Sequence, residues 1–267
     1  MTMSDKQKCI YGGNMSLIQN ELTLSNKYKL TVIAGTELVE LTVKNVAIVE
    51  AMLRNDSAAL KAFDKNAAPN GQYKGSTAYW MIQLKNALQD NSSIQDEEYK
   101  KIITEAIAAV DRENSTHLNA DGIGREEIAK RLYAIERQTL IDYLKNPKTT
   151  ELKIINIISD KTNPTGTNAS GKKYKSRTNL SFASKFCHYA CYYLFEGEEE
   201  QDNYSIYDNI LSKAIPLYVK HYGLEKRNLN SYQEYRKTID EIIKKSKADI
   251  SRNGFDHLLW YFFRGRV

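Results

Sequence analysis

Apolar residues at helical spacing fill most of this chain and constrain its fold more than any other feature. Side chains three or four positions apart lie on one face of a helix, so each such group predicts a helix with a buried face. The predicted helices lie around Val46–Leu53, Trp80–Leu88, Ile102–Val110, Ile128–Leu144, Phe182–Phe195, Asn209–Tyr222, Tyr232–Lys247 and Phe255–Phe263. The fourth is long and ends before Pro147. Leu152–Ile158 fits either a short helix or a strand.

The pattern differs between residues 21 and 43. Apolar residues alternate with other residues there, and Gly35 marks a turn. The alternating pairs are Leu22/Leu24, Leu30/Val32 and Leu41/Val43. Alternation of period two is typical of strands, so we expect a small N-terminal antiparallel β region before a mainly α body. An Asn-, Asp- and Gly-rich stretch near 114–124 predicts two lobes. The first, residues 1–115, holds the β region and helices, and the second, residues 116–267, is helical.

Composition limits the functional classes. The chain is 42% hydrophobic and 27% charged, which is ordinary for a globular protein. It contains no run of 18 apolar residues, and its first residues lack the apolar core of a signal peptide. We therefore expect no membrane span and a cytoplasmic location. Three cysteines, Cys9, Cys187 and Cys191, are too few for a disulfide framework. We expect a monomer.

A basic segment without any acidic residue extends from Lys161 to Lys185. Its basic residues are Lys161, Lys172, Lys173, Lys175, Arg177 and Lys185. This excess is larger than the net charge of +5 of the whole chain. The segment is rich in Gly, Ser, Thr and Asn and therefore predicts a loop. Such a loop can follow a phosphate backbone with its side chains and amides, although most basic stretches are solvated surface loops.

Two residues, one at the end of this segment and one beyond it, suit chemistry on a sugar. Lys185 lies one turn into a predicted helix, and Asp208 lies directly before the next predicted helix. A lysine can act as a nucleophile. A carboxylate can stabilise the cationic sugar that forms when a glycosidic bond breaks. Each residue also has an ordinary alternative role, as a surface lysine and as an aspartate that caps a helix.

The segment from Leu152 to Leu224 resembles the core of the helix-hairpin-helix DNA glycosylase superfamily, in particular its 8-oxoguanine glycosylase branch. In that family a hairpin leads into the helix of the catalytic lysine, and a later extended run ends in the catalytic aspartate at the start of a helix. Here Ser184–Phe186 matches the lysine position and Tyr204–Asp208 matches the aspartate position. Thr178–Ala183 replaces the family's Gly-rich hairpin turn, and the Val-His or Thr-His pair after the aspartate is absent.

The resemblance implies a helix-hairpin-helix glycosylase-like body and a DNA N-glycosylase that flips a base out of the double helix and excises it. Asp208 would stabilise the sugar cation. Lys185 would form a Schiff base that permits β-elimination and nicking of the strand, for which its amine must be neutral. The expected partner is double-stranded DNA with a damaged base, or with a modified phage base such as glucosylated hydroxymethylcytosine, which would mean anti-phage defence. No cofactor is expected.

Further DNA contacts are expected from polar residues around the catalytic pair. They are Lys172, Lys173, Lys175, Arg177, Asn179, Ser181 and Lys213. Aromatic residues near Lys185 offer rings for stacking on bases, or belong to the core. These are Phe182, Phe186, Tyr189, Tyr192 and Tyr193.

Cys187, His188 and Cys191 could suggest a metal site, but no second ligand pair follows at zinc spacing, so we expect no metal.

Two other functional classes remain open. The segments Arg112–His117 and Arg252–His257 follow an Arg-x4-His pattern that resembles the motif of the metal-independent HEPN ribonucleases. In a simpler interpretation, Asp256 and His257 open the last helix. The third class is a non-catalytic DNA-binding module, which would keep the basic loop without needing Lys185 or Asp208.

Overall fold

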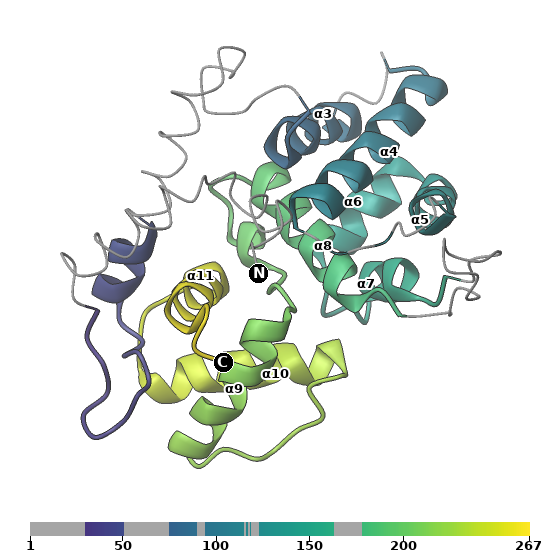
Figure 1. Ribbon diagram of the computed structural model, residues 1–267. Coiled ribbons are helices and arrows are strands. Elements are labelled where there is room, and N and C mark those ends of the chain that lie inside the picture. The colour runs from purple at the N-terminus through teal and green to yellow at the C-terminus, as the bar shows by residue number, and fades with distance from the viewer. Residues whose placement is uncertain are drawn as a thin grey trace, which may run out of the picture. The chain divides into compact units, whose positions relative to one another are not determined.

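The computed structural model describes residues 30–50, 75–89, 94–114, 116, 118, 123–162 and 178–267. This part of the chain is mainly helical, as the apolar spacing predicts (Figure 1). It divides into two compact units. The first holds the described residues between 75 and 204, and the second holds residues 30–50 and 205–267. The lobe boundary predicted between residues 115 and 116 lies within the first unit.

The first unit is built around one buried helix. Its elements are α3 (Thr77–Gln89), α4 (Asp96–Glu113), α5 (Ile123–Tyr133), α6 (Arg137–Lys145), α7 (Lys153–Ser159), α8 (Leu180–Leu194) and the 3₁₀ helix η2 (Glu199–Asp202). Helix α8 packs against α3, α4, α6, α7 and η2 (Figure 1). Nine of its 15 residues are buried. A helix that is apolar on most of its surface is stable only inside a core, which explains its central place.

The long helix predicted over Ile128–Leu144 is two helices, so this prediction was wrong. Helix α5 ends at Tyr133 and α6 begins at Arg137. Glu136 caps α6, because its carboxylate accepts a hydrogen bond from the backbone N–H of Thr139 at 3.0 Å. This bond lowers the pKa of the Glu136 carboxyl, with further help from the N–H of Gln138 and the Thr139 hydroxyl. A capped helix start competes with continuation of the preceding helix.

The second unit consists of a helical stretch at residues 43–50 and of α9 (Asn209–His221), α10 (Tyr232–Ser246) and α11 (Arg252–Phe263). Helices α9, α10 and α11 pack against one another. Their shared core holds the rings of Tyr218, Phe255 and Phe263, which meet edge to face at centroid distances of 6.2–6.4 Å. Gly254 allows close approach of the 43–50 helix, because a Cβ at this position would lie 2.8 Å from Cγ1 of Val46.

The expected β region is represented, within residues 30–50, by one isolated antiparallel bridge between Val32 and Val39. The residues from 21 to 29 lie outside the described part of the chain. Val43 belongs to a helix rather than to a strand. The buried side chain of Asn45 ties the turn to this helix, since its Nδ2 donates to the carbonyls of Thr31 and Glu40 at 2.9 and 2.8 Å.

Candidate active site

Lys185 lies on the one stripe of α8 that reaches the surface of the first unit. Its neighbours Ser184 and Phe186 are buried, whereas Lys185 is partly exposed. Ser181 and Tyr189 are also partly exposed and lie one turn before and one turn after Lys185. The Tyr189 hydroxyl donates to Oδ1 of Asn114 at 3.1 Å. The lysine therefore stands on a rigid, well-packed helix with hydroxyl groups on both sides along its face.

The helix of Lys185 also holds the start of the run that leads to Asp208. His188 is buried, and its Nδ1 lies 3.0 Å from the carbonyl oxygen of Tyr204. The Tyr204 ring is fully buried, and its hydroxyl donates to the carbonyl of Tyr143 at 2.9 Å. The backbone carbonyl and the side-chain hydroxyl of Tyr204 are thus both held by hydrogen bonds within the first unit.

The cysteines near His188 are part of the core. Cys187 and Cys191 are buried, and burial raises the pKa of the Cys187 thiol well above its usual value. The Sγ of Cys191 donates to the carbonyl of Leu144 at 3.6 Å. Across the described ranges, no three His, Cys, Asp or Glu side chains gather in a way that could hold a metal ion.

Asp208 is the N-cap of α9 in the second unit. Its Oδ1 accepts a hydrogen bond from the backbone N–H of Leu211 at 2.8 Å, and its own backbone is extended, with φ −139° and ψ 175°. The capping role that sequence allows is therefore real. It occupies Oδ1, and a cap and a catalytic carboxylate can be the same residue.

Buried side chains from two helices hold the run before Asp208. The Tyr232 hydroxyl on α10 donates to the carbonyl of Ser205 at 2.7 Å, and the Tyr235 hydroxyl donates to the carbonyl of Ile206 at 2.8 Å. From α11, Oδ2 of Asp256 accepts from the N–H of Ile206 at 2.8 Å. Burial raises the pKa of Tyr235 well above its usual value, and the nearby Asp256 and Asp208 carboxylates act in the same direction. The phenol therefore stays protonated and remains a donor.

Sequence reasoning missed these three residues. It placed Asp256 at the opening of the last helix, but α11 begins at Arg252. The cap is Ser251, whose Oγ accepts from the N–H of Gly254 at 3.0 Å. Asp256 thus lies in the second turn of α11 and is only 1% exposed. The one signal available was an acidic residue among the apolar residues of a helix, which is unusual for a buried face.

The predicted DNA contacts fall in different environments. Lys172, Lys173, Lys175 and Arg177 lie outside the described residues. Asn179 is buried as the N-cap of α8, where its Nδ2 donates to the Thr162 hydroxyl at 3.3 Å. Ser181 is partly exposed in the first turn of α8, and Lys213 is exposed on α9. The segment matched to the family's hairpin, Thr178–Ala183, is helical from Leu180 onward.

The two arginines of the alternative ribonuclease motif bind other groups of the protein. Arg252 donates from Nε and Nη2 to the two carboxylate oxygens of Asp240 at 2.6 and 3.0 Å. Burial lowers the pKa of His257 to about 4. In the first unit, Nη2 of Arg112 donates to the carbonyl of Gly75 at 2.6 Å, and His117 lies outside the described residues.

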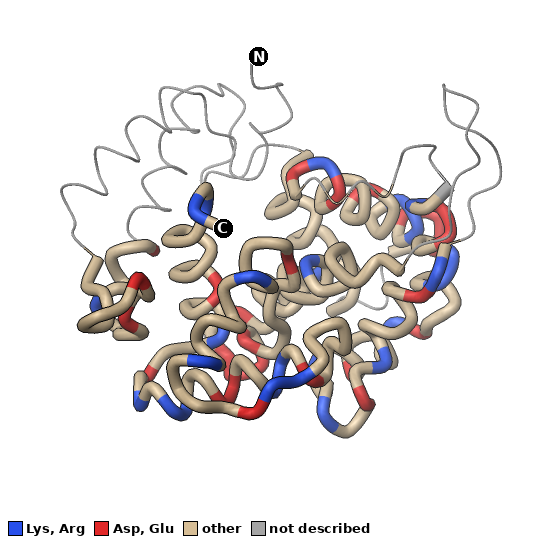
Figure 2. Tube along the Cα trace, turned by 60° about the horizontal axis from the view of Figure 1, so that its bottom comes forward, with Lys and Arg blue, Asp and Glu red and all other residues tan. Residues whose placement is uncertain are grey.

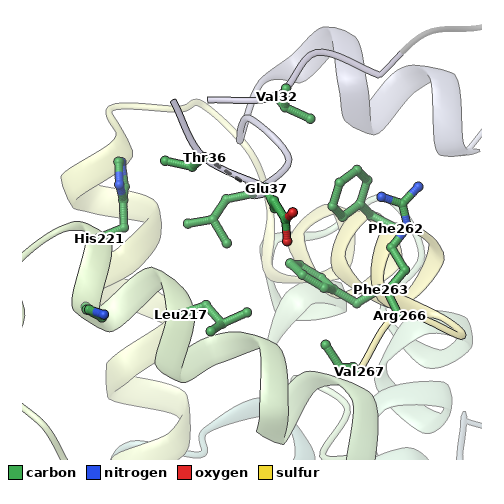
Figure 3. A pocket seen from close by; sticks show the side chains of 11 residues that line it. Val32, Thr36, Glu37, Leu217, His221, Phe262, Phe263, Arg266 and Val267 are labelled. Carbon is green, nitrogen blue, oxygen red and sulfur yellow. Dashed lines mark hydrogen bonds between the residues drawn. The ribbon is translucent and has the colours of Figure 1, made fainter. Parts of the chain in front are cut away.

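The second unit also has a surface hollow of about 860 Å³, which Figure 3 shows. Its apolar lining includes Leu217, Phe262 and Phe263, and its charged lining includes Glu37 and Arg266. The Arg266 guanidinium lies 4.2 Å from the centroid of the Phe262 ring. Leu217 is nine residues beyond Asp208, about 14 Å along the axis of α9 at 1.5 Å per residue. The hollow is therefore separate from the Asp208 carboxylate.

Basic and acidic residues are interspersed along the described trace (Figure 2). Charge alone therefore does not mark a nucleic-acid interface there. In the same ranges, no helix has the length and apolarity that crossing a bilayer requires. Comparison of the chain with protein-family models, with curated proteins and with solved structures gave no match.

Proposed function

We propose that the protein is a DNA glycosylase that uses Asp208 and Lys185 to excise a base. The observation that carries this proposal is that hydrogen bonds hold the backbone of Ser205 and Ile206, just before Asp208. Three buried polar side chains bind successive backbone groups of that run. A helix cap needs only a local hydrogen bond, whereas a carboxylate that stabilises a transition state must be held in a fixed position.

The residue types suit the reaction. The sugar becomes cationic as its bond to the base breaks, and a carboxylate near the anomeric carbon stabilises that charge. This is the role proposed for Asp208. Lys185 is the proposed nucleophile, because an amine can form a Schiff base with the opened sugar and so permit β-elimination. Its place on a partly exposed stripe of a buried helix combines access with a fixed position.

The substrate class proposed is double-stranded DNA with a damaged base or a hypermodified phage base. A target base must leave the stack to be excised, and aromatic rings beside the site can then stack on it. Tyr189 and Tyr192 lie one and about two turns after Lys185, and both rings pack against His188 at centroid distances of 5.2 and 6.4 Å. Tyr192 is exposed and is available for such stacking.

Abasic-site formation is the test. Purified protein is incubated with plain, oxidised and glucosylated phage DNA, and abasic sites are labelled with an aldehyde-reactive probe. The matched control is Asp208→Asn, since asparagine caps a helix as well as aspartate does but carries no charge. A signal on one DNA that the variant lacks supports the proposal and names the substrate class. The absence of signal on every DNA, together with cleavage of an RNA control, would overturn it.

A further inference from the structure

We propose that Asp256 is a positioning residue, which fixes the backbone of Ile206 and thereby the carboxylate of Asp208. The inference rests on the proposed glycosylase function for its catalytic consequence. Its structural part is that the hydrogen bond from the Ile206 N–H to Asp256, called the grip on Ile206 below, holds this residue in place. That part rests on the geometry of the second unit alone.

Ile206 is held through both of its backbone polar groups. Its N–H donates to Asp256 on α11, and its carbonyl accepts from Tyr235 on α10, each at 2.8 Å. In a sheet, a neighbouring strand would satisfy these groups. Here side chains from two helices take the place of a strand. Because each of the two bonds is 2.8 Å long, Ile206 cannot move away from either helix without weakening a hydrogen bond.

The two residues after Ile206 are also restrained. The Tyr207 ring packs edge to face on Tyr235 at a centroid distance of 4.9 Å. Beyond it, the N–H of Leu211 holds Oδ1 of Asp208. The carboxylate is therefore restrained from upstream by the grip on Ile206 and from downstream by the first turn of α9. Only the backbone of Tyr207 and Asp208 lies between these two restraints.

A carboxylate suits this grip better than a neutral acceptor would. Burying an ionisable group is unfavourable unless hydrogen bonds compensate for the lost hydration. Asp256 is 1% exposed, and its Oδ2 accepts from the Ile206 N–H at 2.8 Å. A carboxylate accepts such a bond more strongly than a neutral group does. Placing an ionisable side chain in the core to bind one backbone N–H is consistent with a need for precise placement of that residue.

The chain offers a matched control for the loss of helix packing. The Arg252–Asp240 ion pair joins the same two helices, α11 and α10, that hold Ile206. Arg252 lies one turn before Asp256 on α11. Asp240→Asn therefore weakens the contact between these helices without touching the run from Ser205 to Asp208.

The experiment compares the full-length wild type with Asp256→Ala, Asp256→Asn, Tyr235→Phe and Asp240→Asn. Amide hydrogen exchange at Ile206 and Leu211 is measured by NMR. Base release is measured in single turnovers on the DNA found to be a substrate, and DNA affinity is measured separately. Small displacements of a reacting group reduce rates by large factors, so we expect release by Asp256→Ala to fall about 10- to 100-fold with DNA affinity little changed. Its Ile206 amide exchanges faster.

Conservative replacement distinguishes positioning from bulk stability. An asparagine oxygen can still accept from the Ile206 N–H, so Asp256→Asn is expected to stay within about 3-fold of the wild-type rate, as is Asp240→Asn. Tyr235→Phe removes the hydroxyl that donates to the Ile206 carbonyl. If Asp256→Ala does not fold, the rate of base release by Tyr235→Phe tests whether holding Ile206 matters. Equal losses in Asp240→Asn and Asp256→Ala would overturn positioning in favour of general stability.

The two proposals can fail separately. If the wild type releases base and neither Asp256→Ala nor Tyr235→Phe slows release, the positioning role is overturned and the glycosylase remains. If the wild type releases no base from any DNA, the glycosylase proposal fails. Exchange at Ile206 then decides the structural part. Faster exchange in Asp256→Ala supports the grip, and unchanged exchange overturns it.

Discussion

Asp208 and Leu211 close the first turn of α9 through a 2.8 Å hydrogen bond from the Leu211 N–H to Oδ1 of the carboxylate. The bond makes Asp208 a structural residue whether or not it is also catalytic. The two roles can be separated because capping requires an acceptor oxygen, whereas stabilising a sugar cation requires a negative charge.

Asp208→Asn is expected to abolish base release while the free energy of unfolding stays within about 0.5 kcal/mol of the wild type, because the cap is kept. Asp208→Ala removes the cap as well and is expected to cost about 1 kcal/mol in addition to the activity. Urea unfolding and the abasic-site assay measure the two effects. Base release retained by Asp208→Asn would contradict the catalytic assignment.

Lys185→Gln is expected to remove strand nicking and trapping of the protein on DNA by borohydride, because glutamine cannot form a Schiff base. Base release by attack of water can continue in this variant. The matched control is Lys101→Gln, which changes an exposed lysine on α4 of the same unit. Trapping that persists in Lys185→Gln would place the nucleophile on another residue.

The half-buried ring of His257 predicts a loss of stability in acid. Burial lowers its pKa from 6.5 to about 4 in the folded protein, so the unfolded chain binds a proton first as the pH falls. The contribution of His257 to the free energy of unfolding is fully present above about pH 6.5 and is lost as the pH falls to about 4. The loss is on the order of 2–3 kcal/mol, since one pKa unit corresponds to about 1.4 kcal/mol and the ring is not fully covered.

Denaturant unfolding between pH 7 and pH 4 measures this slope. His257→Gln is expected to flatten it, and His221→Gln, at an exposed position of α9, is the control. Equal slopes for the wild type and His257→Gln would mean that His257 takes up its proton at the same pH in the folded and the unfolded protein.

Gly254→Ala tests the contact between the 43–50 helix and α11. The new methyl would lie 2.8 Å from Cγ1 of Val46, so the Val46 side chain or one of the helices must shift. Overpacking of this kind costs about 1–3 kcal/mol, although alanine alone favours a helix over glycine. Adding Val46→Ala removes the clash. A double-mutant cycle is therefore expected to show a favourable coupling of about 1 kcal/mol or more, and strict additivity would contradict the contact.

Periodicity predicted the presence of helices but not their ends. The apolar residues of Phe182–Phe195 mark α8 closely, since that helix is buried on most of its surface. The break after α5 was missed because Ile135 continues the apolar spacing through it, while the cap at Glu136 depends on a single local hydrogen bond. At residues 30–43, alternation suggested strands, but the segment has one bridge and a turn held by Asn45.

In the candidate site too, features set by neighbouring residues could be predicted from sequence, and contacts between residues far apart in the chain could not. The position of Asp208 before an apolar helix is local, so its capping role could be read from sequence. The contact between Asp256 and Ile206 joins residues 50 positions apart, and no spacing rule connects them. Tyr232 and Tyr235 fall in a predicted helix, but their hydroxyl contacts with the run before Asp208 appear only when α10 is packed.

The second unit is discontinuous in sequence, and this has a consequence for synthesis on the ribosome. The Tyr218 hydroxyl donates to the carbonyl of Val39 at 2.7 Å across a separation of 179 residues. At typical elongation rates of about 5–20 residues per second, Val39 waits roughly 9–36 s for this partner to be made. The helices of the first unit are completed during that interval and can fold first. The unit that carries Asp208 can therefore form only after the first unit has been made, and Val39 stays without this partner until Tyr218 has been synthesised.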